Sequence, residues 1–135
     1  MDMFRPLVTG IVSIVVLDGV WLGVLMGGFY RTALGPIART SADGSLAPIW
    51  AAAAPVYVLL ALGQYLFVMP KVAPGAYGDA LLWGALFGLI VYGVYDFTNW
   101  STLRDYSPML VLVDVGWGTA ASAVVAAVMR FSMKP

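Results

Sequence analysis

The chain alternates four long apolar runs with short segments that are rich in polar residues, proline and glycine. The runs cover residues 7–30, 49–69, 80–97 and 109–129. About 20 predominantly apolar residues are enough to cross a bilayer as a helix. We therefore predict an all-α integral membrane protein, a four-helix bundle with antiparallel up-down spans, formed as a single domain over residues 1–135.

Helix breakers and caps separate the predicted spans. Gly35-Pro36 is expected to stop the first helix, and Pro70 and Pro74-Gly75 lie between the second and third runs. Ser107-Pro108 has the pattern of an N-cap followed by proline at the first helical position. The fourth helix is therefore predicted to begin there.

Composition agrees with this pattern. Hydrophobic residues make up 61% of the 135 residues and charged residues 10%, with no net charge, and the mean hydropathy is +0.90. A soluble domain is closer to half apolar and one quarter charged. No basic cluster favours nucleic acid as a partner. Membrane lipids and other membrane helices, in a homo-oligomer or a larger complex, are the expected partners.

The chain has no cysteine and no histidine. It therefore has no disulfide or thiolate nucleophile, and no imidazole ligand for haem, pigment or zinc. We expect no cofactor and no metal site, although a bound lipid is compatible with the composition.

Charges at the ends of the runs predict the orientation. Four basic residues lie on one side and three on the other, which places both termini in the cytoplasm: Arg5, Lys71, Arg130 and Lys134 against Arg31, Arg39 and Arg104. Aromatic residues are expected to mark the two membrane interfaces. One belt is Phe29, Tyr30, Tyr95, Trp100 and Tyr106, and the other is Phe4, Tyr65, Phe67, Tyr77 and Phe131.

Three aspartates, Asp18, Asp96 and Asp114, lie inside apolar runs that contain no lysine or arginine. A carboxyl group in a membrane is costly, and it is usually neutral, hydrogen-bonded or exposed to a water-filled cavity. We predict a polar cluster at one end of the bundle, with Asp18 below it. Its remaining expected members are Trp21, Tyr92, Asn99, Arg104 and Trp117. Packing, a ligand or ion site, and a proton relay are its three candidate roles.

A short pattern occurs twice. Asp18 and Trp21 have the same spacing as Asp114 and Trp117, and three-residue spacing places each pair on one helix face. The first and fourth spans run in opposite directions, so the two copies fit either coincidence or an inverted repeat, as in many transporters.

Small residues form stripes that allow helices to approach closely. The expected packing positions are Gly19, Gly23, Gly27, Gly84, Gly88 and Gly118. Such stripes serve packing within the bundle or contact with helices of another protein. The segment between Arg31 and Pro48 is either a plain surface loop, or a short interfacial helix or lid over the polar end.

Three blocks carry a family resemblance: LDGVWLG at 17–23, FYRTALG at 29–35 and YGVYDFTNWSTL at 92–103, followed by VDVGWG at 113–118. Together they resemble the small membrane proteins grouped as domain of unknown function 2177. The resemblance implies a bacterial inner-membrane protein with four helices, and no established activity. The family often has a histidine after its Leu-Gly, where this chain has Pro36, so no role of that histidine carries over.

Three functions remain open. The first is a non-enzymatic subunit or interaction module of a larger membrane assembly, which the glycine stripes and the lack of a catalytic motif favour. The second is binding or transport of a small solute, ion or lipid through the intramembrane aspartates. The third is a lipid-modifying enzyme in which two carboxyl groups act as acid and base.

Overall fold

A computed structural model describes residues 3–133. Four helices in it are long and apolar enough to cross a membrane: Phe4–Leu25, Trp50–Lys71, Tyr77–Thr102 and Pro108–Ser132. The described residues form no strand, apart from an isolated bridge between Thr40 and Leu46. The predicted all-α membrane fold is therefore confirmed. Lys134, one of the charges used for the orientation, lies outside the described residues.

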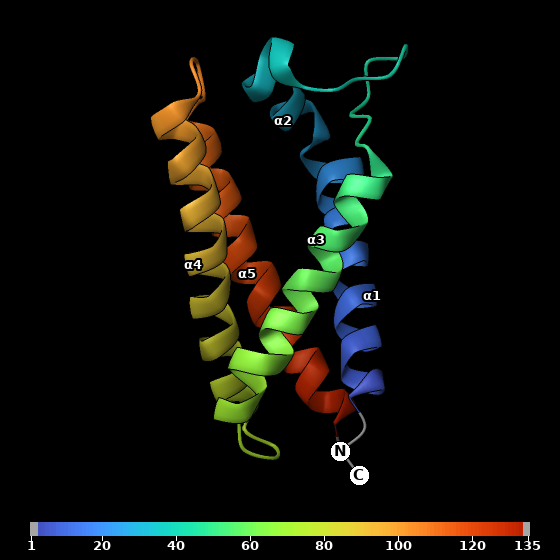
Figure 1. The fold of residues 1–135 in the computed structure, drawn as a ribbon, viewed down its shortest axis with the longest axis vertical. Coiled ribbons are helices and arrows are strands. Elements are labelled where there is room, and N and C mark those ends of the chain that lie inside the picture. Colours follow the sequence, from blue (N-terminus) through green and yellow to red (C-terminus); the bar gives the residue numbers. More distant parts are fainter. Residues whose placement is uncertain (1–2, 134–135) are drawn as a thin grey trace.

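The four spans alternate in direction along the bundle (Figure 1). Helix α4 (Tyr77–Thr102) and helix α5 (Pro108–Ser132) form the most extensive pair, and α1 (Phe4–Val20) packs on α5. Helix α3 (Trp50–Gly63) packs along α1, and only its continuation, Gln64–Lys71, makes substantial contact with α4 and α5. The first half of α3 is therefore spread away from the α4–α5 pair.

The first span ends earlier than the sequence predicts. A π-helical turn, η1 (Trp21–Leu25), follows α1, and Met26 leaves the helical conformation at φ −122° and ψ 1°. A separate helix, α2 (Gly27–Leu34), then begins. A Cβ atom on Gly27 would overlap the carbonyl oxygen of Leu22, so glycine is needed at this bend. The predicted stop at Gly35-Pro36 ends α2, through a 3₁₀ turn, Gly35–Ile37.

Two other boundaries follow from side-chain hydrogen bonds. Helix α4 continues five residues beyond 97 to Thr102, and the hydroxyls of Ser101 and Thr102 donate to the carbonyl of Thr98 at 2.8 Å. At the start of α5, the Ser107 side chain accepts a bond from the backbone N–H of Leu110. The predicted Ser-Pro cap is confirmed.

Glycines bring α4 and α5 together. A Cβ on Gly88 would overlap the Gly118 carbonyl, and one on Gly84 would overlap Ala126. The Tyr92 ring lies directly over Gly118. These three glycines pack as expected, whereas Gly19 and Gly23 are exposed with no atom of another element near them. The prediction of packing at Gly19 and Gly23 does not hold within the chain, because η1 and the preceding turn of α1 point them outward.

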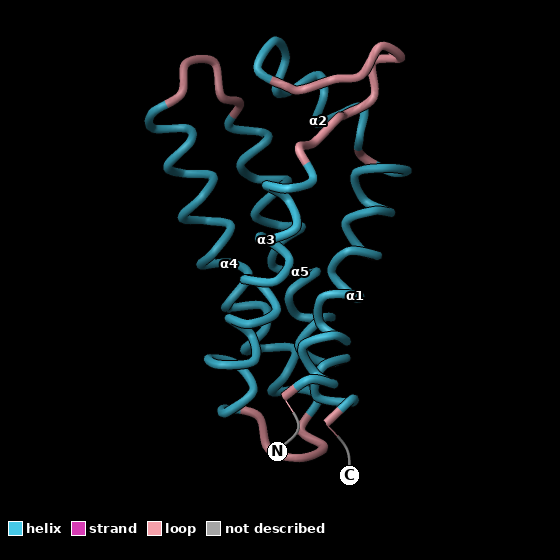
Figure 2. The backbone as a smooth tube through the Cα atoms, turned by 45° about the vertical axis from the view of Figure 1, so that its right-hand side comes forward, coloured by secondary structure: helices cyan, strands magenta, loops and turns pink. Residues whose placement is uncertain are grey.

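Apolar side chains form two separate buried clusters. The inner cluster, near the ends of α1 and α5 where the described chain begins and ends, includes Ile14, Leu60, Val125 and Met129. The outer cluster lies at the opposite end and consists of Tyr30, Tyr106, Leu110 and Val111. Loops join the helices at both ends (Figure 2). Asp18, Asp96 and Asp114 lie between the two clusters.

Candidate functional site

Helices α1 and α5 place their Asp-x-x-Trp patterns against each other. The indole rings of Trp21 and Trp117 stack with centroids 4.3 Å apart and parallel planes. The Trp117 Nε1–H donates to Asp18 Oδ1 at 2.8 Å. Because each aspartate is one turn from its tryptophan, antiparallel packing brings the indole of one copy to the carboxyl of the other.

The second copy makes the corresponding contact through a tyrosine. The Trp21 Nε1–H donates to the Tyr30 hydroxyl at 3.1 Å, and that hydroxyl donates to Asp114 Oδ1 at 2.5 Å. Tyr30 belongs to α2, beyond the bend at Met26. Burial raises the pKa of Tyr30 above its ordinary value, and its hydrogen bond to Asp114 raises it further. The hydroxyl therefore keeps its proton and remains a donor.

Asp96 is the most buried of the three carboxyl groups, with no exposed surface. Its Oδ1 accepts a hydrogen bond from the Tyr106 hydroxyl at 2.8 Å, whereas Oδ2 has no hydrogen-bond partner. The carboxyl groups of Asp96 and Asp114 interact electrostatically. Burial also raises the pKa of Tyr106, which keeps this second hydroxyl protonated.

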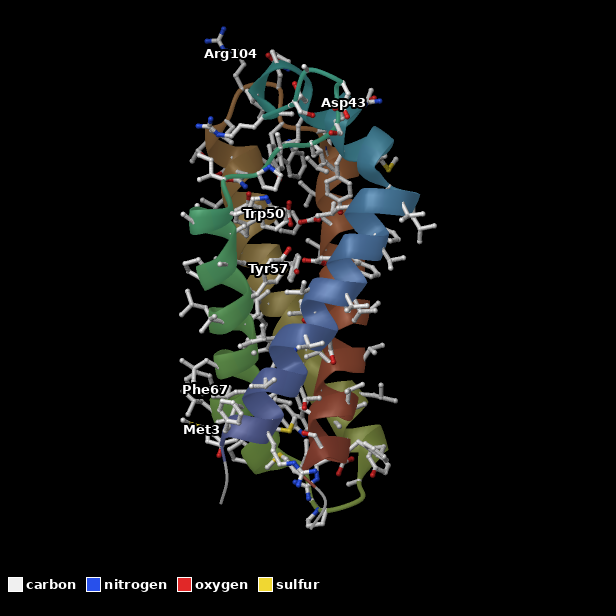
Figure 3. The ribbon with its side chains drawn as sticks, turned by 90° about the vertical axis from the view of Figure 1, so that its right-hand side faces the viewer. Met3, Asp43, Trp50, Tyr57, Phe67 and Arg104 are labelled. Carbon is white, nitrogen blue, oxygen red and sulfur yellow. The ribbon has the colours of Figure 1, made fainter. Side chains whose placement is uncertain are left out.

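Two further tyrosines border the carboxyl groups. The Tyr57 hydroxyl interacts with Asp18, and Figure 3 shows the Tyr57 side chain on the inner side of α3. Tyr92 interacts electrostatically with all three aspartates, and Gly118 leaves the space that its ring occupies. We refer to the complete set as the polar layer: Asp18, Trp21, Tyr30, Tyr57, Tyr92, Asp96, Tyr106, Asp114 and Trp117.

The polar layer is acidic. Every lysine and arginine of the four described spans lies at the opposite end of the bundle, at Arg5, Lys71 or Arg130. The inner cluster contains Ile14 one turn before Asp18, and the outer cluster contains Val111 one turn before Asp114. The carboxyl groups therefore lie between the inner and outer clusters, and no lysine or arginine of the described spans lies beside them.

Comparison with known families agrees with the membrane fold. The family model described as predicted membrane protein (DUF2177) matches residues 4–131. The chain belongs to this DUF2177 family. Comparisons with curated proteins and with solved structures found no match. The resemblance expected from the sequence is thus confirmed.

In this DUF2177 protein, six predicted site residues do come together: Asp18, Trp21, Tyr92, Asp96, Asp114 and Trp117. Arg104 does not join them. It is exposed at the outer end of the molecule, where its side chain points away from the bundle (Figure 3). Asn99 interacts with the hydroxyl of Tyr106 instead of with a carboxyl.

The conformation of the α4–α5 link explains why Arg104 is not in the layer. Leu103 is extended after the end of α4, and Asp105 has a positive φ of 62°. The turn directs Tyr106 inward, where it is 7% exposed. Tyr106 thus takes the place next to Asp96 that the sequence suggested for Arg104.

Three tyrosines of the polar layer were not predicted as site residues from the sequence. Tyr30 and Tyr106 were expected in an interfacial aromatic belt, but both are buried and donate to carboxyl groups. Tyr57 carried no signal apart from its position in an apolar run. Tyr30 and Asp114 are 84 residues apart, so no local pattern could have linked them.

The segment after α2 folds over the outer end of the bundle. Ala33, Leu34 and Leu46 pack against the outer cluster, and the Arg31 guanidinium donates to the Gly44 carbonyl at 2.6 Å. We call residues 27–47 the cap. The segment combines both interpretations: it is helical up to Ile37, and residues 38–49 form an irregular loop.

A serine-rich turn gives the cap its own internal order. The Asp43 carboxyl accepts hydrogen bonds from the hydroxyls of Ser41 and Ser45 and from the Ser45 backbone. The bond from Ser41, followed by those from Ser45, lowers the pKa of Asp43 to about 2. Asp43 is therefore ionised at any physiological pH.

Proposed function

We propose that this protein lies in the inner membrane of a bacterium and binds a small solute or ion in the polar layer, either to hold the solute or to transport it across the membrane. One observation carries the proposal: three carboxyl groups from three helices converge between the inner and outer clusters without a cation among them. Carboxyl groups within a membrane are expensive and usually mark a site or a pathway. Packing alone is served by neutral polar side chains.

A thermal-shift screen of the purified protein in lipid nanodiscs tests this proposal. The panel contains methylammonium, sodium, acetate and acetamide, each at the same ionic strength. At least one solute is expected to raise the unfolding temperature of the wild type, and Asp114→Asn is expected to remove the shift. Asp79→Asn is the matched control because Asp79 is an exposed carboxylate in the first turn of α4, at the opposite end. The absence of a shift with every class of solute contradicts the proposal.

A second candidate is a subunit or interaction module of a larger membrane assembly. Its support is the exposed stripe of Gly19 and Gly23 on the first span, which has no neighbour within the chain. Gly19→Leu is expected to disrupt such an assembly, whereas Gly28→Leu, at another open glycine, is expected to leave it intact. Native gel electrophoresis after extraction in mild detergent distinguishes these results. If the wild type and both variants all migrate as monomers, the result argues against the role as a subunit.

For the orientation, we propose cytoplasmic termini and a cap on the outer side. The basic residues at the two ends of the spans support this assignment. Because the chain has no cysteine, single cysteines can be introduced at Ala42 in the cap and Ala73 in the α3–α4 link. An impermeant thiol reagent applied to intact cells is expected to label Ala42→Cys alone. Labelling of Ala73→Cys alone reverses the orientation.

A further inference from the structure

Two side-chain acceptors of the spans are buried with no hydrogen-bond partner. They are Asp96 Oδ2 and Gln64 Oε1, and their residues are 0% and 2% exposed. Arg130 Nε is a buried donor without a partner, and it lies in the last turn of α5, at the opposite end from Asp96. Buried polar atoms are nearly always hydrogen-bonded, so two orphan acceptors in the membrane interior indicate a missing donor.

Gln64 supplies this evidence independently of the aspartates. It lies on α3's continuation, seven residues after Tyr57, which places both side chains on one helix face about 10 Å apart along the axis. Gln64 is also the first residue of a π-helical turn, η3 (Gln64–Val68), as Trp21 is of η1. Such turns occur often at functional sites.

The acidic charge and the aromatic rings of the polar layer narrow the chemical class of the ligand further. Asp18 accepts a hydrogen bond from Trp117 at Oδ1 and also interacts with the Tyr57 hydroxyl, and Asp114 accepts one from Tyr30 at Oδ1. A carboxylate has about four acceptor positions, so each group retains capacity for a further donor. The partly exposed rings of Tyr57 and Tyr92 adjoin these carboxyl groups, and aromatic faces attract cations. A ligand with N–H donors can satisfy these remaining acceptor positions.

We infer that the ligand of the polar layer is a small amine in its ammonium form, whose N–H groups donate to Asp96 and Asp114 and whose charge balances the carboxyl groups. An ammonium group has up to three donors and no acceptor, which matches the unpartnered Oδ2 of Asp96 in the polar layer. This inference rests on the proposed function and specifies its substrate class.

The test compares probes on the wild-type protein in lipid nanodiscs at constant pH and ionic strength. Methylammonium and 1,4-diaminobutane carry N–H donors, tetramethylammonium has charge without donors, and acetamide has donors without charge. Binding is followed through the fluorescence of the tryptophans, which include the stacked Trp21–Trp117 pair. The two amines are expected to bind saturably, and the other two probes at least about tenfold more weakly.

Variants then locate the site. Asp96→Asn and Asp114→Asn are expected to weaken amine binding at least about tenfold, as for removal of one partner of a buried charge pair, and Asp79→Asn to leave it unchanged. Because the selectivity series uses the wild type, it remains decisive if a variant fails to fold.

Three results overturn the inference. Saturable binding of acetamide in place of the amines overturns it and leaves the proposed function standing. Tetramethylammonium that binds as tightly as methylammonium overturns the role of the N–H donors. If no solute binds and only a change of pH alters the fluorescence, both the inference and the proposed function fail.

Discussion

The two Asp-x-x-Trp patterns have the same spacing and different surroundings. In α1, Asp18 receives a hydrogen bond directly from the opposite indole, whereas in α5 Asp114 receives one from Tyr30, with the other indole behind it. The α1 helix bends into a π-helical turn at Trp21, while α5 continues regularly to Ser132. Spacing thus selects the helix face, and the neighbouring elements determine which group donates to each carboxyl.

The glycines that follow the two patterns should differ most. A methyl group on Gly118 would overlap the Tyr92 ring, whereas Gly23 has open space around it. Gly118→Ala is expected to reduce the free energy of unfolding by about 3 kcal/mol, the upper range for overpacking. Gly23→Ala is expected to leave it unchanged or raise it by up to about 1 kcal/mol, because alanine is the better helix former. Steric-trapping measurements in bicelles give both values; equal effects would mean that Tyr92 is not held against Gly118.

Removing one indole N–H at a time distinguishes the direct contact from the relayed one. Trp117→Phe leaves Asp18 without its indole donor and is expected to cost about 2 kcal/mol. Trp21→Phe leaves Tyr30 bonded to Asp114 and is expected to cost about 0.6 kcal/mol, typical of a hydrogen bond between membrane helices. Phenylalanine keeps an aromatic ring at the stack in both. The same unfolding assay measures them, and a larger cost for Trp21→Phe reverses the assignment.

Tyr30→Phe tests whether the relay is specific to the α5 pattern. In a double-mutant cycle with Trp21→Phe, a coupling energy of about 0.5 kcal/mol or more is expected, because the two side chains share a hydrogen bond. In the cycle of Tyr30→Phe with Trp117→Phe, the two effects are expected to add within about 0.3–0.5 kcal/mol, because the Trp117 indole bonds to Asp18 and not to Tyr30. Strong coupling in the second cycle would show that both patterns act as one network.

The smallest stability effect is expected at the cap. Arg31→Gln loses the exposed contact with the Gly44 carbonyl and is expected to change the free energy of unfolding by less than about 0.5 kcal/mol. It should nevertheless speed hydrogen exchange in residues 38–47, with no change around Asp18. Arg104→Gln, at an exposed arginine outside the cap, is the control. Unchanged exchange in both variants would mean that Arg31 does not hold the cap.

Sequence alone predicts the apolar spans and the carboxyl groups well because both depend on local pattern. Four spans, the Ser107-Pro108 cap and the presence of polar residues in the membrane follow from hydropathy and helix geometry. The bend at Met26 does not, because it depends on a π-helical turn and on the approach of Gly27 to the Leu22 carbonyl. Local pattern also assigned Tyr30 to an interface, whereas the bend carries it back over Asp114.

The link between α4 and α5 illustrates the same limit. Charge made Arg104 the obvious partner for the aspartates, but the positive φ of Asp105 decides which side chain turns inward, and that side chain is Tyr106. Backbone conformation in a short link is set by tertiary packing as much as by residue type. The acids and the indole of Trp117 could therefore be predicted, whereas the tyrosine donors Tyr30 and Tyr106 could not.

Tyr30 belongs both to the cap and to the polar layer, so a movement of the cap would change the hydrogen bonding of Asp114. The same helix, α2, packs on the outer cluster and supplies the hydroxyl that donates to Asp114. If the proposed ligand enters beneath the cap, lifting the cap would expose Asp114 and break its bond from Tyr30 in a single movement. The carboxyl would then be free for an incoming donor, and closing the cap would restore the competing bond. The opening of the cap and the affinity of Asp114 for a donor would thus change together, without a separate signal between them.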